Sequence, residues 1–518
     1  MGILILIITL HFYFTRNYNF WKSRGVIGPK PLPIFGTIHD IIIGKRSIGT
    51  YAKEIYDNYP AEKFVGVYGG SKPILVLRDT ELIKDVLIKH FNVFMDRGLG
   101  YNEKQEPLSA HLVSLDAKRW RLLRQNLSPM FTSCKLKNMF YLIAHESDRM
   151  VEQLSLFDGK DIDIREITNK YTINVIGTCI FGLQIDNASN IFYEMGQRFF
   201  RKNLKNKMRF RLRTFAPFLF NLIGSWLTDW ELQNFYINLT RENISYRKEK
   251  SINRHDFIDL MAKLKDESDK VDNMDITYPL IAAQLFAFMV GGYESSSITI
   301  SNCIYELALN NDVQNKLREE INESFINTRG VITYDLLKEM NYLDKVFNET
   351  LRKYPPINFT MRVSSEKYTF SGTNLTIPKG VIIWIPIMGI QKDPKYYPNP
   401  ELFDPERFEN GKSKRPPMSY LPFGDGPRNC IGWRFGEIQV KIGLINFLKN
   451  FKVHVCEKTD KNYTFDHTAF FSTPLNGIHL NITGTVAILG VHIGALFVKP
   501  SPLAGGCGQT EGVERVRE

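Results

Sequence analysis

The chain is poor in cysteine, in long apolar segments and in motifs for nucleic acid. Six cysteines are scattered over 518 residues, which is too few for a disulfide framework and indicates a reducing compartment. The 66 Lys and Arg exceed the 55 Asp and Glu, a formal charge of +11, but they are spread along the chain. We therefore expect no nucleic-acid partner, and the basic excess favours a membrane surface or an acidic protein partner.

Hydrophobic residues make up 43% of the chain and charged residues 23%, which excludes an intrinsically disordered protein. Helical periodicity dominates from about residue 80 to residue 482, and short segments alternate like strands. The pattern predicts a mainly α fold with small β-sheets (α+β). Helices are expected over residues 51–59, 116–127, 137–157, 165–181, 190–204, 229–249, 278–309, 311–326, 335–353 and 433–449, and strands over 63–68, 73–77, 370–376 and 381–385.

The N-terminus is the one segment that could enter a membrane. Residues 1–14 are apolar, and the run reaches the about 20 residues of a spanning helix only if it continues through the aromatic residues to Trp21. Lys22 and Arg24 would then lie on the cytoplasmic side. Because no small-residue cleavage pattern follows, we predict an uncleaved anchor over residues 1–24, with a buried helix as the alternative.

Two further segments stand apart from the body. Residues 25–36 carry prolines at alternate positions, which forbids a helix and predicts a stiff hinge. Residues 483–518 lack Asn, Asp and Tyr, in which the body is rich. Their apolar run over 486–498 is too short to span a bilayer, so we expect an atypical C-terminal extension without a catalytic role.

The most informative segment is FGDGPRNCIG, residues 423–432. Its glycines permit close approach to a flat ligand, and Cys430 precedes a predicted helix whose positive end stabilises a thiolate. Arg428 adds a cation, and Phe423 can shield the sulfur. A lone cysteine cannot form a structural zinc site, but it can be the single protein ligand of a haem iron; the alternative is a buried free cysteine.

The same segment resembles the haem-binding signature F-x-x-G-x-R-x-C-x-G of the cytochrome P-450 haem-thiolate monooxygenases at every fixed position. The resemblance covers about residues 25–482. It implies one catalytic domain over 37–482, with a long central helix over a haem b (iron protoporphyrin IX) whose iron Cys430 ligates. Residues 94–98, 349–356 and 423–436 are most similar to the microsomal insect detoxification branch, whereas Gln391 departs from the family's usual His.

The resemblance also implies roles for residues elsewhere in the chain. Trp120 and Arg124, spaced i and i+4, together with Arg362 and Arg428 would bind the haem propionates, because an arginine fork suits a carboxylate. Phe423 and Gly424 would contact the haem. A buried ion network that holds the cysteine loop would consist of Glu349, Arg352 and Arg407.

Two glycines interrupt the middle of the helix expected over residues 278–309. Gly291 and Gly292 each cost about 1 kcal/mol in a helix, and we expect a locally opened helix that makes room for dioxygen. Glu294 and Ser295 match the family's acid and alcohol pair, which guides protons to bound oxygen. Since Ser lacks the methyl of the usual Thr, proton delivery is expected to be less well ordered and to leak peroxide.

The implied reaction inserts one atom of O2 into an apolar small molecule. The sequence shows no flavin or nicotinamide fingerprint, so the resemblance implies electrons from an NADPH-dependent flavoprotein reductase, and possibly a cytochrome b-type donor. It also implies a microsomal protein of the endoplasmic reticulum membrane with its catalytic domain facing the cytosol. The candidate docking residues are Lys118, Arg121, Lys135, Lys137 and Arg434.

Substrate contacts are expected from the loop 97–115, the aromatic-rich stretch 195–222 and a set of mostly apolar residues. Phenylalanines dominate, which favours a large apolar substrate such as a xenobiotic, insecticide, plant toxin, hormone or lipid. Two alternatives are a haem-thiolate isomerase or dehydratase of peroxides, against which the Glu294–Ser295 pair argues, and a non-catalytic haem- or ligand-binding protein. The expected pocket residues are Phe286, Phe288, Val290, Gly291, Ile357, Asn358 and Phe471.

Overall fold

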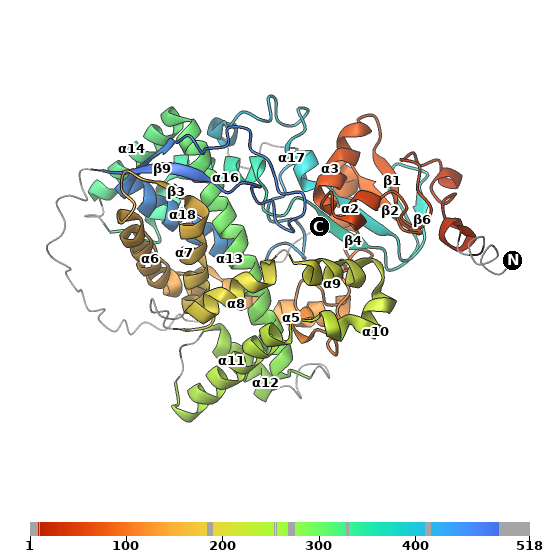
Figure 1. Ribbon diagram of the computed structural model, residues 1–518, viewed down its shortest axis with the longest axis horizontal. Coiled ribbons are helices and arrows are strands. Elements are labelled where there is room, and N and C mark those ends of the chain that lie inside the picture. Colours follow the sequence, from red (N-terminus) through yellow and green to blue (C-terminus); the bar gives the residue numbers. More distant parts are fainter. Residues whose placement is uncertain are drawn as a thin grey trace.

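One long helix, α13 (Tyr278–Leu309), runs through the middle of the molecule (Figure 1). A four-stranded sheet with α2 and α3 lies at one end, and α6, α7, α14 and α18 lie at the other. The computed structural model describes residues 9, 11–183, 190–201, 203–252, 254, 256–267, 275–327, 331–409 and 416–485. The predicted mainly α class with small sheets is confirmed.

The other α-helices include α7, α11, α14, α16 and α18, which pack directly against α13. Their bounds are α2 (His39–Ile43), α3 (Ile48–Asn58), α4 (Thr80–Lys84), α5 (Ala117–Leu127), α6 (Ser133–Ser155), α7 (Ile164–Cys179), α8 (Asn190–Phe200), α9 (Leu204–Phe215), α10 (Pro217–Leu227), α11 (Trp230–Glu249), α12 (Phe257–Asp266), α14 (Asn311–Asn327), α15 (Leu336–Glu339), α16 (Asn341–Lys353), α17 (Ile387–Gln391) and α18 (Trp433–Asn450).

Three small sheets complete the described architecture. The largest has the order β1-β2-β7-β4, in which β2 and β7 are parallel and the other neighbours are antiparallel. The others are β3-β9-β8 and the pair β5-β6. The strands are β1 (Phe64–Gly69), β2 (Lys72–Leu77), β3 (Asp161–Asp163), β4 (Thr360–Val363), β5 (Tyr368–Thr369), β6 (Thr376–Ile377), β7 (Ile382–Ile385), β8 (Phe451–Val455) and β9 (His479–Gly484).

Helix α13 is buried on nearly all sides, as a helix that is apolar around its whole circumference must be. The Thr277 hydroxyl accepts a hydrogen bond from the Leu280 amide and caps its start. The helix continues without a break past Gly291 and Gly292, so the expected local opening is wrong. Gly292 packs closely on α7, because a Cβ there would lie 2.4 Å from Ile176 Cδ1 and that side chain would have to move.

The N-terminal segment joins the body earlier than the predicted anchor allows. Trp21 is 2% exposed, its Nε1 donates to the Val67 carbonyl at 3.0 Å, and its ring covers Gly66 of β1. The extension of the anchor to Trp21 is therefore wrong, because this aromatic residue belongs to the core beside the sheet. Among the described residues, no helix combines the length and the apolar character needed to cross a membrane.

The proline-rich segment 25–36 lies along the same sheet. The Ile27 carbonyl accepts a hydrogen bond from the Gly66 amide at 2.9 Å. Gly28 approaches so closely that a Cβ would lie 1.9 Å from the Gly66 carbonyl oxygen. The segment is thus packed on β1 along part of its length, and its prolines fix an extended path there.

Several predicted boundaries differ from the structure for local reasons. The strand expected over 370–376 is wrong, because residues 370–375 form the turn between β5 and β6, with Gly372 at φ +66°, and only Thr376 lies in a strand. The helix expected over 335–353 is divided at Met340. Helices α9, α10 and α12 were not expected, since the first is strongly basic and the second is apolar on more than one face, which obscures the helical period.

The C-terminal end of the described chain belongs to the body. Strand β9 continues to Gly484, and the Thr485 amide donates to the Asn450 carbonyl at 2.9 Å. The first residues of the predicted extension over 483–518 thus complete the three-stranded sheet. Residues 486–518 lie outside the described residues.

The burial of Trp21 predicts a stability effect. Trp21→Ala should lower the free energy of unfolding by about 3–5 kcal/mol, because it removes a large core side chain. Trp226→Ala is the matched control: Trp226 is 82% exposed, and its replacement should change stability by less than about 0.5 kcal/mol. Urea unfolding midpoints measure both, and equal midpoints for the two variants would contradict the placement of Trp21.

Candidate functional site

The cysteine loop turns sharply before α18 begins at Trp433. Gly424 and Gly426 have φ values of +70° and +73°, a region that favours glycine. The Cys430 amide donates to the Phe423 carbonyl at 2.8 Å and closes the loop. A Cβ on Gly426 would lie 1.9 Å from the Leu87 carbonyl oxygen, so this position tolerates only glycine.

Cys430 borders a hollow inside the molecule. It is surrounded by protein, and this burial raises the pKa of its thiol, yet its side chain is exposed. The Gly432 amide and the guanidiniums of Arg124 and Arg97 act in the opposite direction and lower that pKa. The surroundings of the sulfur therefore include the groups that favour a thiolate.

The middle of α13 lies opposite the start of α18. A Cβ on Gly436 of α18 would lie 3.9 Å from the Ser296 hydroxyl of α13. One turn earlier, Gly291 is exposed although most of the helix is buried, and a Cβ there would meet no atom within 4 Å. The room beside the helix thus comes from the missing side chain of Gly291.

Three arginines gather beside the loop. Arg428 is 1% exposed and donates to the carbonyls of Met95 and Leu115, the second at 2.7 Å. Arg97 Nη2 donates to the Arg428 carbonyl at 2.8 Å. Arg362 is 2% exposed and donates to the Met361 carbonyl at 2.8 Å. All three cations are therefore held mainly by backbone carbonyls, which carry no full negative charge.

The charges of this cluster repel one another. Burial, followed by Arg97 and Arg428, holds the pKa of Arg362 well below its usual value. Burial also lowers the pKa of Arg428 to about 9 and that of Arg97 to about 10. The nearest acid is Asp96, whose Oδ1 lies 3.9 Å from Arg428 Nη1. The Nε atoms of Arg362 and Arg428 have no hydrogen-bond partner among the described residues.

This donor set fits the two propionates of a haem. A buried cation cluster is stable only with a counter-charge, and carboxylates would supply both the charge and acceptors for the unpartnered Nε atoms. The ring of Trp120 packs against this cluster, because Arg428 Cζ lies over it at 4.9 Å from the ring centroid. Arg124 was predicted to bind a propionate, but its Nη1 and Nη2 instead donate to Asn429 O and Oδ1 of the cysteine loop, each at 2.8 Å.

Glu349 and Arg352 form a fully buried ion pair behind the loop. Arg352 Nε and Nη2 donate to the two carboxylate oxygens at 2.7 and 2.8 Å. Arg407 Nε lies 3.5 Å from Glu349 Oε1. Burial raises the pKa of Glu349, and Arg352 opposes that shift. Arg352 also donates to the carbonyls of Gln391 and Pro400, so the network connects α16 to the chain that leads into the loop.

Gln391 makes three hydrogen bonds at the position where the family usually has His. Its Nε2 donates to the Leu351 and Arg352 carbonyls at 3.0 Å each, and its Oε1 accepts from the Leu421 amide at 2.8 Å. Leu421 is two residues before Phe423. A side-chain amide can donate twice and accept at the same time, which a single imidazole cannot do.

Glu294 and Ser295 do not contact each other. The Glu294 carboxylate accepts a hydrogen bond from Arg165 Nη2 of α7 at 2.6 Å, whereas the Ser295 hydroxyl donates to the Gly291 carbonyl. Adjacent helical residues point in different directions, so direct proton transfer between the pair has no path in this arrangement. The sequence pattern did not indicate Arg165.

The predicted pocket residues divide into three groups. Phe288, Val290 and Ile357 are partly exposed in the interior, whereas Phe286 is buried between Phe199 and Tyr236. Phe471 packs against Phe200, with ring centroids 5.8 Å apart.

Asn358, which was expected to line the pocket, is only 7% exposed. Its side-chain Oδ1 would lie 1.7 Å from a Cβ on Gly49, so it is enclosed by packing against α3. The sequence analysis did not assign Arg97 to haem binding, although it lies in the segment 94–98 that carries the family resemblance and at the start of the loop 97–115 expected to contact substrate. His111 was also not assigned, and burial, Arg213 and Arg97 lower its pKa to about 3.

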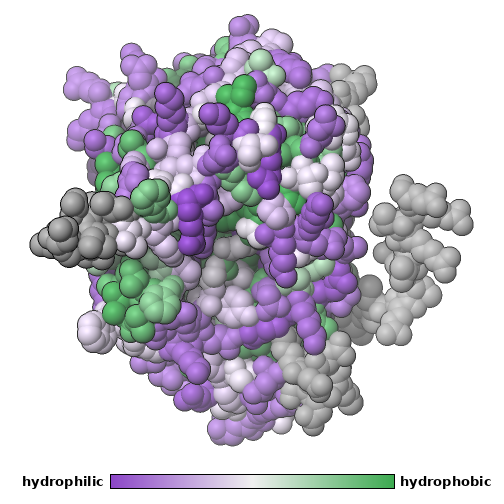
Figure 2. All heavy atoms as spheres, turned by 90° about the vertical axis from the view of Figure 1, so that its right-hand side faces the viewer, coloured by the Kyte–Doolittle hydropathy of each residue, from purple (hydrophilic) through white to green (hydrophobic). Residues whose placement is uncertain are grey.

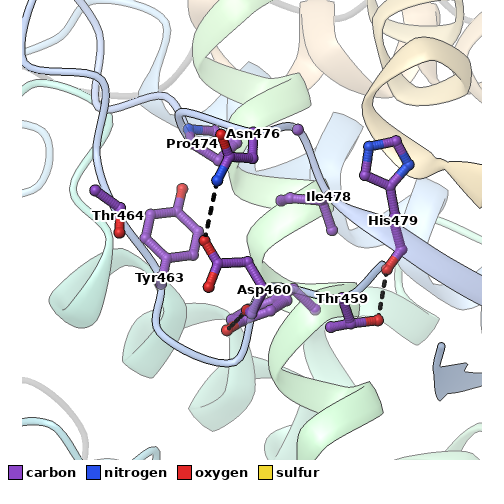
Figure 3. A pocket seen from close by; sticks show the side chains of 10 residues that line it. Thr459, Asp460, Tyr463, Thr464, Pro474, Asn476, Ile478 and His479 are labelled. Carbon is purple, nitrogen blue, oxygen red and sulfur yellow. Dashed lines mark hydrogen bonds between the residues drawn. The ribbon is translucent and has the colours of Figure 1, made fainter. Parts of the chain in front are cut away.

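A second hollow lies away from these residues. Figure 3 shows a small polar pocket between the segments 459–464 and 474–479. Its volume of about 10 Å³ is room for about one water. Asn476 and Asp460, and Thr459 with the His479 carbonyl, are joined across it by hydrogen bonds. This pocket is too small for a haem, and none of the predicted haem residues lines it.

A cysteine that faces an interior hollow under a long helix, with buried arginines for a dianion, defines a haem-thiolate protein. Comparison with known proteins agrees: the sequence model of the family Cytochrome P450 matches residues 27–481. The chain belongs to the cytochrome P450 family, whose members use haem b with a cysteine thiolate ligand and act as monooxygenases with O2 and a redox partner. The predicted family, cofactor and reaction class are confirmed.

The relatives found in this comparison are insect proteins. Cytochrome P450 6B1 of Papilio polyxenes is 39% identical over 488 residues, which cover 91% of this chain and 97% of the relative. Cytochrome P450 6B2 of Helicoverpa armigera is 38% identical, with coverages of 92% and 96%. Probable cytochrome P450 6a20 of Drosophila melanogaster is 38% identical, with coverages of 93% and 98%. The predicted likeness to an insect branch is confirmed.

The buried ion pair predicts a non-additive stability series. Glu349→Leu and Arg352→Met should each cost about 3–5 kcal/mol, because each leaves one buried charge without its partner. The double variant should cost less than the two single variants together. Urea unfolding of all four proteins measures the coupling, and purely additive losses would contradict a direct pair.

Proposed function

We propose that Cys430 is the thiolate ligand of the haem and that the enzyme oxygenates apolar small molecules such as xenobiotics, plant toxins, insecticides, hormones or lipids. The observation that carries this proposal is the joint placement of the exposed Cys430 side chain, the buried Arg362 and Arg428 and the half-buried Arg97 around one interior space. When bound, the haem supplies the activation of O2 for insertion of one oxygen atom into the substrate.

The chain's own residues hold and orient that group. Arg97, Arg362 and Arg428 bind the propionates, and the Glu349 network keeps the cysteine loop in place. Arg124 holds the loop through Asn429 and favours the Cys430 thiolate by its charge. Phe423 and Gly424 line the loop on the side of the cysteine. We assign Trp120 a supporting role under Arg428.

Proton delivery involves Glu294 and Ser295 on different sides of α13. Arg165 fixes the Glu294 carboxylate near α7, and Ser295 holds its hydroxyl beside Gly291. A bridging water or a change of the Glu294 rotamer is needed to connect them. The acid thus serves as a proton reservoir and the alcohol as the last donor before bound oxygen.

The substrate region is apolar on several sides. Phe288, Val290, Gly291 and Ile357 line the interior near α13, and the phenylalanines of α8 and residue 471 close it with Phe286. Such a lining favours a large apolar molecule, because burial of apolar surface drives its binding.

Electrons come from a partner that docks beside the cysteine loop, which we propose is an NADPH-dependent flavoprotein reductase, with a cytochrome b-type donor as an additional source. Arg121 is on α5 with Arg124, which bonds the loop, and Arg434 follows Cys430 by four residues. A basic rim of this kind attracts an acidic partner. Lys118, Arg121, Lys137 and Arg434 are exposed, and Lys135 is half-buried.

The location we propose is the endoplasmic reticulum membrane, with the catalytic domain in the cytosol. Helix α10 presents apolar residues to solvent at i, i+4 and i+8: Phe218 is 73%, Leu222 65% and Trp226 82% exposed. Figure 2 views the side on which α10 lies and shows hydrophobic side chains gathered in one place on a mostly hydrophilic face. An apolar helix face of this kind suits insertion into a lipid interface.

The carbon monoxide difference spectrum of the reduced protein tests the ligand. The wild type should show a strongly red-shifted Soret band, and Cys430→Ser should lose it, because only a thiolate ligand produces that shift. Cys134→Ser is the control, since Cys134 is an exposed thiol elsewhere in the chain. A red-shifted band that survives in Cys430→Ser would refute the assignment.

Replacement of Ser295 by threonine tests proton delivery. Ser295→Thr should lower the hydrogen peroxide released per NADPH consumed, because the added methyl restricts the rotamer of the hydroxyl. Peroxide and NADPH are measured in the same reaction with reductase, and reductase alone provides the background. Equal peroxide yields for the two proteins would show that the serine does not cause leakage.

A further inference from the structure

Helix α9 buries a cation where a surface helix usually buries an apolar stripe. Arg209 is its only buried residue, at 6% exposed. Leu204 and Met208 of the same helix are exposed. Burial of a charge is costly unless the charge is paired and hydrogen-bonded. The position of Arg209 therefore requires a function beyond attachment of α9 to the body.

The chain provides only part of a partner for this cation. Glu106, at 4% exposed, accepts a hydrogen bond from Arg213 Nη1 at 2.9 Å. Arg209 Nη1 lies 3.6 Å from the other oxygen of Glu106 and makes no hydrogen bond among the described residues. The other acid near Arg209 is Asp229, which accepts from Arg198 Nε at 2.6 Å. Two guanidiniums thus share one carboxylate.

The positive charge extends from α9 toward the cysteine loop. Arg213 and Arg97 both act on His111 and lower its pKa, so His111 lies within the field of both arginines. Arg97 in turn donates to the Arg428 carbonyl in the loop. Arg213 of α9 and Arg97 beside the cysteine loop therefore act on one common residue, His111.

The same arginine adjoins the apolar part of the interior. Arg209 Cζ lies 5.9 Å from the ring centroid of Phe199 on α8. Phe199 packs edge-on against Phe286 of α13, with centroids 5.2 Å apart. A molecule that reached Arg209 with one end would have aromatic side chains along the path to α13.

We propose that Arg209 and Arg213 form a carboxylate-binding site on the buried side of α9, which selects lipophilic substrates that carry an acid group. The ligand carboxylate accepts from the unpartnered Arg209 Nη1 and shares Arg213 with Glu106, which acts as an internal competitor. Arginine suits this task because its fork offers several donors to a carboxylate. The inference rests on the proposed function and names a substrate class for it.

Equilibrium dialysis of the full-length holoenzyme with dodecanoate and with methyl dodecanoate tests the site. Arg209→Gln and Arg213→Gln should each weaken dodecanoate binding about tenfold or more, because a charged hydrogen bond is lost. The methyl ester should change by less than about twofold. Lys205→Gln removes the same charge from an exposed position of the same helix and should leave both ligands unaffected.

Glu106→Gln distinguishes a ligand site from a structural clasp, in which Arg209 and Arg213 would only hold α9 to Glu106. Removal of the competing acid should strengthen dodecanoate binding several-fold and leave the ester unchanged. A structural clasp would instead weaken the binding of both ligands in all three site variants, and that result would overturn the proposal. Equal changes in the affinities for dodecanoate and for its methyl ester would also overturn the proposal.

The carbon monoxide spectrum of each preparation is recorded alongside. Dialysis does not depend on turnover, so a missing thiolate band would count against the haem assignment, whereas loss of acid selectivity with the band intact would count against the α9 site alone. A variant with normal haem content and an unchanged melting temperature has retained its fold.

Discussion

The positive charge of three clustered arginines, two of them buried, is the constraint on which the site depends. Arg97, Arg362 and Arg428 are held mainly by backbone carbonyls. Besides burial, Arg97 lowers the pKa of both other arginines, and Arg428 lowers that of Arg362. The protein thus bears a large electrostatic cost that its own acids do not offset. A dianionic cofactor bound there would remove that cost, and its binding energy would then add to the stability of the folded protein. Cofactor binding and folding would be coupled through this cluster.

The two adjacent glycines of α13 have different surroundings and therefore different roles. Gly292 lies close to Ile176 of α7, whose side chain would have to move for a larger residue, whereas a Cβ on Gly291 would meet no atom. Gly292 allows α13 to approach α7 closely, and Gly291 keeps one side of α13 clear. Neither breaks the helix, because tertiary packing around α13 compensates for their low propensity.

Contiguous patterns were predictable from the sequence, and side-chain directions were not. The loop around Cys430 and the spacing of Glu349 and Arg352 indicated the family and the ion pair, because each lies within a few residues of chain. Trp21 could not be placed, since an aromatic residue after an apolar run suits a membrane or a sheet equally. Asn358 and Arg209 depend on contacts with distant segments, at Gly49 and Glu106, and no local pattern encodes those contacts.

Gln391 shows how a single departure from a family pattern keeps the architecture and changes its chemistry. Its amide joins the end of α16 to the chain before the cysteine loop through three hydrogen bonds. An imidazole at this place would gain or lose a proton near neutral pH, and its hydrogen bonds would change with it. An amide has no such transition. The support of the cysteine loop at this point therefore does not depend on pH. The hydrogen bonds from Gln391 to α16 and to the chain before the loop remain the same in acid and alkaline surroundings.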